Sequence, residues 1–400
     1  MKYTGKSKII NPLTIGFISV NNYVNFPIGG GIYFLRNILK YWDITKDKVL
    51  LFGCGPRSMK KGWHRIKIEN QTYPFFKMYT NERKSIIPGR LKAFIGYLLN
   101  RNIINRSGID ILYVHEPGLV LTLIKSNKII VQQMLGRTNP LMFSRFSLFR
   151  RSFFVWFYDT FIHRISLKIS TSVIALNEEC NQFYKEATRR ITHEIIPTCA
   201  DTNRFTKKKY SKNNSGEIVI LYCGRLNKVK GLDFLLRGFF EFLKNNSHSR
   251  LIIVGEGQER NNLQNLSREL QINSNVEFLG FVDYDRLPEI HQISDIFVMT
   301  SFREGLSVSM LEAMASGLAI VSTDNVGAKE VIVDGYNGIL LKNSNRNPII
   351  LSNLLEKAYE NRELLGERAR KTIEKKYSAK IVASMVQERL HSIYEERINT

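Results

Sequence analysis

Two carboxylates, Glu304 and Glu312, stand eight residues apart in the run 302–317. The stretches on either side, 295–300 and 318–323, are apolar and predict buried parallel strands. The run between them therefore predicts a loop followed by a short crossover helix. Two carboxylates so placed could serve one ligand that carries both phosphate and hydroxyl groups.

The expected helix begins after Ser307, which suits an N-cap, and ends near Gly317. Glu304 would then lie in a loop at the carboxyl end of a strand, where open α/β sheets bind ligands, and Glu312 within the helix. The helix N-terminus presents N–H groups and partial positive charge, which suit a phosphate. Sugar hydroxyls can donate to the flanking carboxylates, so a nucleotide sugar is favoured. Alternatively, Glu304 is a solvated loop residue and Glu312 a surface helix residue.

A second polar segment, 224–231, follows an apolar strand-like stretch at 218–223 and precedes a helical pattern at 232–242. Arg225 could hold a diphosphate as a planar fork and Lys230 as a point charge. The alternative is a solvated turn. If both polar segments lie at the same edge of one sheet, the diphosphate interpretation is favoured.

Length and composition predict two globular domains. A chain of 400 residues exceeds what one hydrophobic core usually supports. Its four cysteines show no C-x-x-C spacing, so neither a disulfide framework nor a zinc site is indicated, and a reducing compartment fits. Asp283 and Asp285 flank one residue, but helix capping is favoured over metal binding because a helix-like stretch follows. We expect no metal and no cofactor.

The net charge of +22 indicates either an anionic partner, such as a phosphodiester polymer or an anionic lipid surface, or a role in solubility. No signal-peptide core or run of about 18 apolar residues is present, so a soluble or peripherally attached protein is expected. Two helix-compatible segments, 83–106 and 145–168, are basic, and the second is rich in aromatics. This composition suits docking on a membrane. Alternatively, the aromatic side chains face the core and the arginines face water.

Short apolar runs alternate with helical stretches, which is typical of βαβ units and parallel sheets. The basic, polar stretch 207–216 is the best candidate for a linker between two doubly wound domains. The predicted strands are 14–20, 49–52, 111–114, 129–132 and 172–175 in the first half, and 218–223, 250–254, 276–279, 295–300 and 318–323 in the second.

Three further features lie at strand ends. Gly29 to Gly31 follow the first predicted strand and would let the backbone approach a ligand closely, whereas the glycines at 53–55 and 255–257 suit ordinary turns. His115 ends the strand 111–114 and could position a substrate hydroxyl. A histidine that is only hydrogen-bonded within its loop is the alternative.

Taken together, the motifs resemble the family 4 retaining glycosyltransferases, which have the GT-B fold. The resemblance runs through 224–231, 254–257, 278–282 and 304–317, with further likeness at 196–205 and 334–338. It implies two Rossmann-like, doubly wound domains that face a central cleft. Residues 1–205 would bind the acceptor, residues 206–378 the nucleotide-sugar donor, and a helix at 379–400 would cross back to the first domain.

The resemblance also implies roles for particular residues. Arg225 and Lys230 would bind the diphosphate, Glu304 and the backbone after it the donor sugar and phosphate, and Glu312 the ribose. The implied catalytic residues are Glu304, Arg225, Lys230 and His115. The implied donor-binding residues are Gly30, Gly31, Gly224, Arg225, Lys230, Gly255, Phe281, Glu304, Gly305, Leu306, Ser307 and Glu312.

The first half departs from the family pattern at one position. Relatives commonly carry a histidine after the strand that here begins at Ile129, and this sequence has none between His115 and His163. Gln133 or the backbone near Gly136 would take its place, or the acceptor chemistry differs, or activity is lost.

The leading hypothesis is a retaining transfer of a hexose from a UDP- or GDP-linked sugar to a glycan or polyprenyl-linked acceptor. The protein would act in the cytoplasm, peripherally on the inner face of the cell membrane, in the synthesis of a cell-surface polysaccharide. The alternatives are another GT-B enzyme, such as a phosphorylase or a nucleotide-sugar epimerase, and a basic nucleic-acid-binding protein. No nucleic-acid-binding motif is present, so we expect no nucleic-acid partner.

Overall fold

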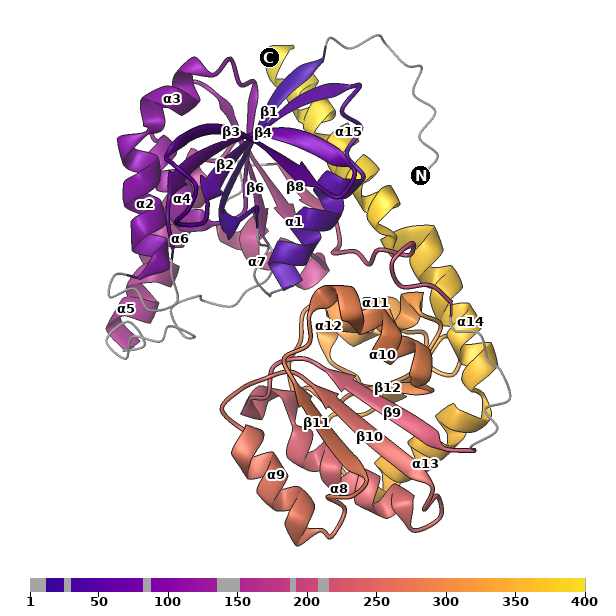
Figure 1. Cartoon of the computed structure of the whole chain (residues 1–400). Helices are drawn as coiled ribbons and strands as arrows, with labels where there is room; N and C mark the ends of the chain where they lie inside the picture. The colour runs from indigo at the N-terminus through magenta and orange to yellow at the C-terminus, as the bar shows by residue number, and fades with distance from the viewer. Residues whose placement is uncertain are drawn as a thin grey trace. The chain divides into compact units, whose positions relative to one another are not determined.

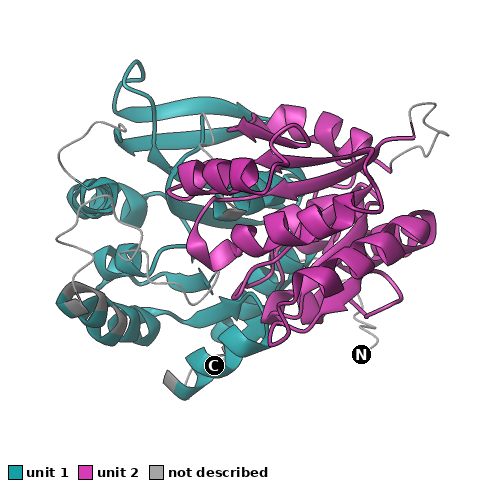
Figure 2. Cartoon of the chain, turned by 90° about the horizontal axis from the view of Figure 1, so that it is seen from below, with its two compact units in different colours: residues 1–196, 383–400 teal, residues 197–382 magenta. Residues whose placement is uncertain are grey.

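The computed structural model describes residues 12–24, 30–81, 88–134, 152–187, 192–207 and 216–399. The chain divides into two compact α/β units, coloured separately in Figure 2. The first unit contains residues 1–196 and 383–400, and the second contains residues 197–382. The helices and strands of both are labelled in Figure 1.

The first unit has an eight-stranded sheet in the order β3-β4-β2-β1-β5-β6-β7-β8. All neighbouring strands are parallel except β3 and β4. Its elements are β1 (Leu13–Asn22), α1 (Gly30–Lys40), β2 (Asp47–Cys54), β3 (Gly62–Ile68), β4 (Gln71–Tyr79), α2 (Gly89–Leu99), α3 (Arg101–Arg106), β5 (Ile111–Val114), α4 (Pro117–Val120), η1 (Leu121–Leu123), β6 (Ile129–Met134), α5 (Ser152–Phe157), the π-helical η4 (Tyr158–Ile162), α6 (His163–Ile169), β7 (Ser172–Ala175), α7 (Glu178–Ala187) and β8 (Thr192–Ile195), with the C-terminal helix α15 (Ala379–Ile398).

The second unit has a six-stranded, parallel sheet in the order β11-β10-β9-β12-β13-β14. Its elements are β9 (Ile218–Cys223), η5 (Lys228–Lys230), α8 (Leu232–Leu243), β10 (Ser249–Val254), α9 (Arg260–Glu269), β11 (Val276–Gly280), η6 (Tyr284–Arg286), α10 (Leu287–Ile293), β12 (Ile296–Met299), α11 (Val308–Ala315), β13 (Ala319–Thr323), α12 (Val326–Val331), β14 (Ile339–Leu341), α13 (Pro348–Glu360), α14 (Arg362–Thr372) and η7 (Ile373–Tyr377).

All ten predicted strands are confirmed, with ends that differ by a few residues. Four strands were not predicted: β3, β4, β8 and β14. β3, β8 and β14 are edge strands; β3 alternates exposed and buried side chains, and β14 is an apolar run of only three residues. The central strands β12 and β13 are buried at every residue because helices cover both faces of a parallel sheet.

Each sheet reverses its strand order beside its first strand. In the first unit the reversal lies between β1 and β5, and in the second between β9 and β12. An aspartate fixes the amino end of each pair: the Asp110 side chain accepts from Thr14 N at 2.8 Å, and the Asp295 side chain accepts from Val219 N at 2.9 Å. The carboxyl ends of these strands are where doubly wound sheets bind ligands.

The boundary between the units lies between Ile196 and Pro197, earlier than the predicted residue 205. Residues 197–206 pack on the second unit: the Phe205 ring lies 5.0 Å from His291, and Arg370 Nη1 donates to Phe205 O at 2.8 Å. The predicted linker 207–216 is therefore not the boundary, and its residues 208–215 lie outside the described residues.

The end of the chain belongs to the first unit. From residue 383 onward α15 packs there, where Gln387 Nε2 and His391 Nε2 bond to the fully buried Asp47 carboxylate at 2.5 and 2.8 Å. The predicted helix began at residue 379, and α15 begins at Ala379. The predicted central cleft between the domains stays a prediction.

Candidate functional site

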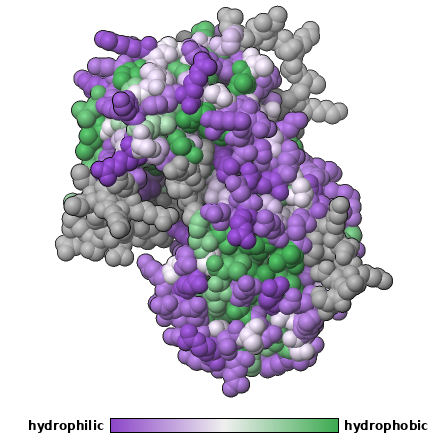
Figure 3. Space-filling view, in the orientation of Figure 1, coloured by the Kyte–Doolittle hydropathy of each residue, from purple (hydrophilic) through white to green (hydrophobic). Residues whose placement is uncertain are grey.

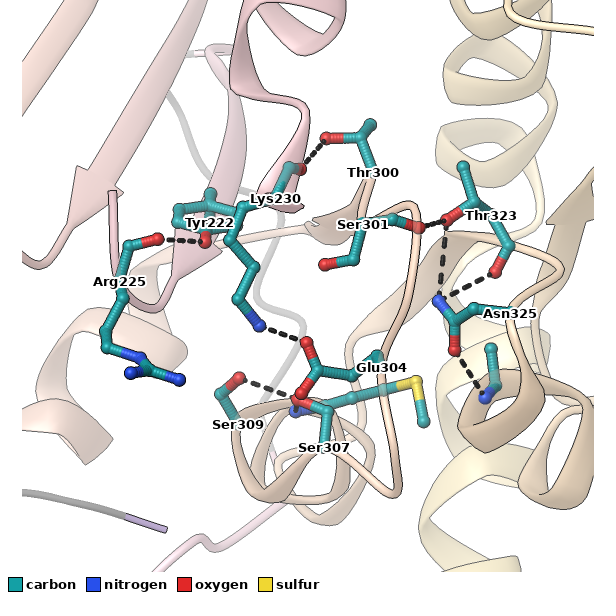
Figure 4. Close-up of polar contacts among 12 residues, drawn as sticks. Tyr222, Arg225, Lys230, Thr300, Ser301, Glu304, Ser307, Ser309, Thr323 and Asn325 are labelled. Atoms are coloured by element: carbon teal, nitrogen blue, oxygen red, sulfur yellow. Dashed lines mark hydrogen bonds and ion pairs between the residues drawn. The ribbon is translucent and has the colours of Figure 1, made fainter. Parts of the chain in front are cut away.

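The sequence motifs lie at the point where the second sheet reverses its strand order. The loop with Arg225 and Lys230 follows β9, and the loop with Glu304 follows β12, the strand next to β9. Because adjacent parallel strands end at the same edge, the two loops meet, as Figure 4 shows. The premise for the diphosphate interpretation, that both segments lie at one sheet edge, is therefore satisfied.

The loop after β9 is held by its own backbone and by the next strand. The Tyr222 hydroxyl donates to Arg225 O at 3.1 Å, and Leu226 N donates to Glu256 O at 3.0 Å. The loop ends at Gly231, whose φ of 61° is left-handed and whose surroundings leave no space for a Cβ atom. Arg225 is exposed, and in Figure 4 its guanidinium extends toward the α11 side of the site.

The loop after β12 leads into α11 through a capped start. Ser307 is the N-cap, as predicted, and its Oγ accepts from Met310 N at 3.4 Å. Glu304 O accepts from Gly327 N at 3.2 Å, which ties the loop to the start of α12. The first N–H groups of α11 have no intrahelical acceptors, so this terminus carries partial positive charge.

Lys230 and Glu304 form an ion pair across the two loops (Figure 4). Both side chains are largely covered, with 14% and 21% of their surfaces exposed. The Thr300 hydroxyl also donates to Lys230 O at 3.0 Å, so the lysine is fixed at both ends. The sequence placed both residues at one ligand but did not predict that they pair with each other.

Arg346 supports both loops from behind, and sequence analysis did not identify it. Its guanidinium lies 3.8 Å from the Phe302 ring centroid and 4.4 Å from that of Phe234. It donates to Thr300 O and to Asn343 Oδ1, both at 3.0 Å. Burial lowers the pKa of the guanidinium. Arg346 stands after β14 and far from either motif, so no local spacing could have indicated it.

We expect Arg346→Met to loosen the two loops without removing a ligand contact. The substitution removes three hydrogen bonds, the third from Nη2 to Gly231 O at 3.5 Å, and the stacking on two rings, which together contribute about 2–4 kcal/mol to stability. Urea unfolding of the variant should show that loss. The neighbouring Arg362, which stacks on Tyr359 away from the loops, provides the control substitution Arg362→Met. An Arg346 variant as stable as this control would contradict the supporting role.

Comparisons with known proteins agree with this arrangement. A family model described as "Glycosyl transferases group 1" matches residues 203–378, which include both loops. Residues 203–378 are therefore similar to the group 1 glycosyl transferases. An uncharacterized glycosyltransferase of Methanocaldococcus jannaschii is 31% identical over 237 residues, which cover 56% of this chain and 59% of that protein. The similarity thus spans less than two thirds of that relative.

Solved structures show the fold of the whole chain. Sucrose-phosphate synthase from Thermosynechococcus elongatus is similar with a TM-score of 0.77 at 14% identity, over 96% of this chain and all of that one. Anabaena HepE in complex with UDP-glucose is similar with a TM-score of 0.67 at 18% identity, over 95% of this chain and all of that one. At such identities the likeness shows fold alone, and the fold is GT-B, as predicted.

Glu312 lies in α11 of the second unit and is only 3% exposed. The alternative interpretation of Glu312 as a surface helix residue is therefore wrong. Burial raises the pKa of its carboxyl to about 8, and the nearby Tyr284 hydroxyl and Arg204 offset part of that rise. Its Oε1 makes no hydrogen bond within the described part of the chain. A ligand hydroxyl would supply the missing donor.

We expect donor affinity to depend on pH through Glu312. With a pKa near 8 the carboxyl is protonated at lower pH in the free domain, and two ribose hydroxyls would bind its ionised form better. Affinity for a nucleotide sugar should therefore rise up to about tenfold per pH unit as pH approaches 8, which corresponds to 1.36 kcal/mol. Calorimetric titration should show this rise in the natural protein and a flat profile in Glu312→Gln. Equal slopes would contradict it.

The carboxylates at 283 and 285 do not cap a helix. Asp283 occupies the N-cap position of η6 without a side-chain hydrogen bond, and Asp285 pairs with Arg204. Capping by a side chain is therefore not observed at either carboxylate, and the Asp285 carboxylate is taken up by Arg204. Within the described ranges no group of three potential metal-ligating side chains is found.

Two other predicted donor-binding residues occupy the adjoining strand ends. Gly255 follows β10, and its N–H donates to Gly280 O at 2.7 Å. Its φ is 131°, and a Cβ there would lie 1.9 Å from Gly224 O, so its loop crosses the β9 loop and is not an ordinary turn. Phe281 follows β11 and is 48% exposed. Gly224 begins the β9 loop, and Gly305 and Leu306 lie in the β12 loop.

His115 lies in the first unit with Gly30 and Gly31, which open α1, so their part in the donor site stays a prediction. Neither ring nitrogen of His115 is hydrogen-bonded within the described residues, so the loop-bonded alternative is not supported. The ring packs edge-on against Tyr113 at 4.9 Å, and burial lowers its pKa to about 3. The imidazole is therefore neutral near pH 7.

Gln133, like His115, contacts Tyr113 in the first unit. It is fully buried, and its Oε1 accepts from the Tyr113 hydroxyl at 2.5 Å, while its Nε2 has no partner in the described part of the chain. An N–H donor thus remains available at the carboxyl end of β6. Gly136, the other predicted substitute for the family histidine, lies outside the described residues.

Proposed function

We propose that the protein is a glycosyltransferase that moves a hexose from a nucleotide-diphospho-sugar to an acceptor hydroxyl, with retention of configuration at the sugar. One observation carries the proposal: Arg225, the Lys230–Glu304 pair and the start of α11 surround one sheet edge where the strand order reverses. Two cations and a helix N-terminus are a diphosphate site. A carboxylate among them suits sugar hydroxyls.

The donor would be a UDP- or GDP-linked hexose. The diphosphate would lie between Arg225 and the first turn of α11, with the ribose at Glu312 and the hexose at Glu304. The structural similarity to Anabaena HepE, solved with UDP-glucose, supports a donor of this class. Binding the diphosphate at Lys230 would also require the ammonium to share its contact with Glu304, so donor binding would redirect the carboxylate toward the sugar.

The transfer would proceed by attack on the face from which the diphosphate leaves. The bond between the anomeric carbon and the β-phosphate oxygen breaks, and the acceptor oxygen forms the new bond to that carbon. The acceptor proton passes to the departing phosphate oxygen, so no separate base is required. Arg225, Lys230 and the α11 N-terminus stabilise the charge that develops on the phosphate, which is electrostatic catalysis by fixed groups.

The acceptor would be a glycan or a polyprenyl-linked glycan at the inner face of the cell membrane, in the synthesis of a cell-surface polysaccharide. No helix in the described ranges is both long and apolar enough to cross a bilayer. The chain would reach such an acceptor from the cytoplasm. His115 and the unpaired Gln133 amide would position its hydroxyl.

The experiment is a turnover assay with UDP- and GDP-hexoses and a membrane extract as acceptor source, followed by NMR of the product. We expect release of the nucleoside diphosphate together with a product whose anomeric configuration matches that of the donor. Lys230→Ala should remove both signals. Inverted configuration would contradict the retaining mechanism. Interconversion of free nucleotide sugars without transfer would identify an epimerase instead.

We expect the same transfer to proceed in EDTA at close to its full rate. The phosphate charge is balanced by Arg225, Lys230 and the α11 terminus, so no divalent cation is needed to neutralise it. The initial rate should be measured before and after chelation, with EDTA saturated by Mg²⁺ as the control. Loss of activity that Mn²⁺ or Mg²⁺ restores would contradict this expectation.

A further inference from the structure

The first unit exposes a stripe of aromatic side chains along one continuous helical segment, α5–η4–α6. Phe153, Trp156, Phe157, Phe161 and Ile165 are between 40% and 63% exposed. Phe153, Phe157, Phe161 and Ile165 recur every four residues, and Trp156 follows Phe153 by three, which places them on one side of the segment. Neighbouring rings touch, with centroids 5.2 Å apart for Phe157 and Phe161 and 5.6 Å apart for Trp156 and Phe161. We call these five residues the aromatic stripe.

A second apolar stripe lies on α2. Leu91, Ile95, Leu98 and Leu99 are between 42% and 74% exposed, and they recur at helical spacing on one side of the helix. The opposite side is buried in the core of the unit through Ala93 and Tyr97. We call these four exposed residues the α2 stripe.

The two stripes belong to the same face of the first sheet. Both α2 and α6 pack against α4 and η1, and all four elements cover one core cluster. Ile124, directly after η1, is 48% exposed between them along this connection. Figure 1 shows α2, α4 and α6 on one face, and Figure 3 shows hydrophobic residues on the surface over α2. We call the two stripes with Ile124 the docking face.

Positive charge surrounds these apolar residues. Residues 1–196 contain 30 Lys and Arg against 11 Asp and Glu, so nearly all of the chain's net charge of +22 belongs to this part. Neither α2 nor α3 contains an acidic residue, and α5–η4–α6 contains one, Asp159. Exposed cations next to the stripes include Arg101, Arg106, Lys125, Arg164 and Lys168.

We propose that the docking face binds the surface of an anionic lipid bilayer, with both apolar stripes inserted at the level of the headgroups. Aromatic and aliphatic side chains beside cations are the composition of interfacial helices. The cations contact anionic headgroups while their aliphatic stems cover the boundary. This inference rests on the proposed function, since it brings the protein to a lipid-linked acceptor.

The inference refines the sequence-based expectation, which named the segments 83–106, where α2 lies, and 145–168. Of the second segment, residues 145–151, with Arg145, Arg150 and Arg151, lie outside the described residues. The described remainder supplies the aromatic stripe, and α2 adds a second insertion point. A protein held by apolar insertion as well as charge should keep part of its binding at high salt, whereas purely electrostatic attachment is screened.

The test uses the full chain and vesicles of phosphatidylcholine with or without phosphatidylglycerol. We expect cosedimentation with the anionic vesicles, partly retained in high salt. Phe157→Ser with Phe161→Ser, and separately Leu98→Ser with Leu99→Ser, should each lower the partition coefficient about tenfold or more, because each pair removes two inserting apolar side chains. The matched control is Ile44→Ser with Ile398→Ser, whose residues are 50% and 64% exposed in the same unit but outside the docking face.

Charge and insertion are separated by two further measurements. Arg164→Glu with Lys168→Glu should weaken binding to anionic vesicles, whereas Lys48→Glu with Lys67→Glu, also exposed in this unit, should weaken it less. Of the three tryptophans, Trp42 is buried and Trp63 and Trp156 are exposed. In a Trp63→Phe background, Trp156 fluorescence should shift to shorter wavelength on vesicle binding and be quenched by brominated lipid.

Several results would overturn the inference. They are absence of binding to anionic vesicles at low salt, binding that both stripe variants leave unchanged, or self-association that the stripe variants abolish while vesicles do not bind. Nucleotide-sugar affinity is measured in the same samples and should not change in any docking variant, which also shows that each variant is folded. A protein that binds the donor but not vesicles would refute the docking face alone. A protein that binds vesicles but no donor would refute the proposed function alone.

Discussion

Lys230→Ala is expected to weaken binding of a nucleotide sugar by about 10- to 100-fold, because a charged contact to the diphosphate contributes roughly 1.5–3 kcal/mol. The loss should exceed that of Arg225→Ala. Arg225 is exposed, whereas Lys230 is largely covered and also neutralises Glu304. Removing Lys230 leaves the Glu304 carboxylate facing the phosphate. Calorimetric titration of each variant measures these differences.

Two variants separate the phosphate contact from the effect on Glu304. Lys228→Ala removes an exposed charge from the same short helix, η5, and should change affinity little. Adding Glu304→Gln to Lys230→Ala should restore part of the affinity for the nucleoside diphosphate, because it removes the unpaired carboxylate. Affinity that is unchanged in Lys230→Ala would contradict the diphosphate site.

Gly255→Ala is expected to destabilise the second unit by about 3 kcal/mol or more, since left-handed backbone costs 1–2 kcal/mol and overpacking adds to it. The added Cβ would lie 1.9 Å from Gly224 O, a backbone atom that cannot move without displacing the β9 loop. Urea unfolding followed by circular dichroism measures the change. Donor binding should be lost together with stability, because the β9 loop that the added Cβ displaces carries Arg225.

Gly335→Ala is the matched control for this substitution. Its φ is 71°, so it bears the cost of left-handed backbone, but no atom lies within 4 Å of the added Cβ. It should lose only about 1–2 kcal/mol. Equal losses in the two variants would show that the crossing of the β9 and β10 loops is not the reason for Gly255.

Much of the fold could be predicted from apolar periodicity because the central strands are buried on both faces and read as continuous apolar runs. The missed strands lie at or next to sheet edges, where β3 alternates exposed and buried residues and β14 is only three residues long. The unit boundary was misplaced for a different reason. The polar composition of 207–216 indicated a linker, but Phe205 and Arg204 pack on the second unit before it.

The sequence predicted which motif residues lie together at the candidate site, but not the contacts that join distant parts of the chain. Strand ends and helix polarity placed Arg225, Lys230 and Glu304 at one edge, and the structure brings them together. The ion pair between two of them and the support by Arg346 depend on tertiary packing. The burial of Glu312 likewise follows from Tyr284 and the 197–206 segment, which no spacing in the 302–317 run reveals.

The central claim is that the carboxyl edge of β9 and β12 binds a nucleotide-diphospho-sugar. A thermal-shift screen of UDP-, GDP- and ADP-sugars tests it most directly, because a ligand that binds only the folded form raises the unfolding midpoint with its concentration. At least one of these donors should raise the midpoint, the matching nucleoside without phosphates should raise it much less, and Lys230→Ala should reduce the shift. Absence of a shift with every donor, or an unchanged shift in Lys230→Ala, would contradict a nucleotide-sugar site at this edge.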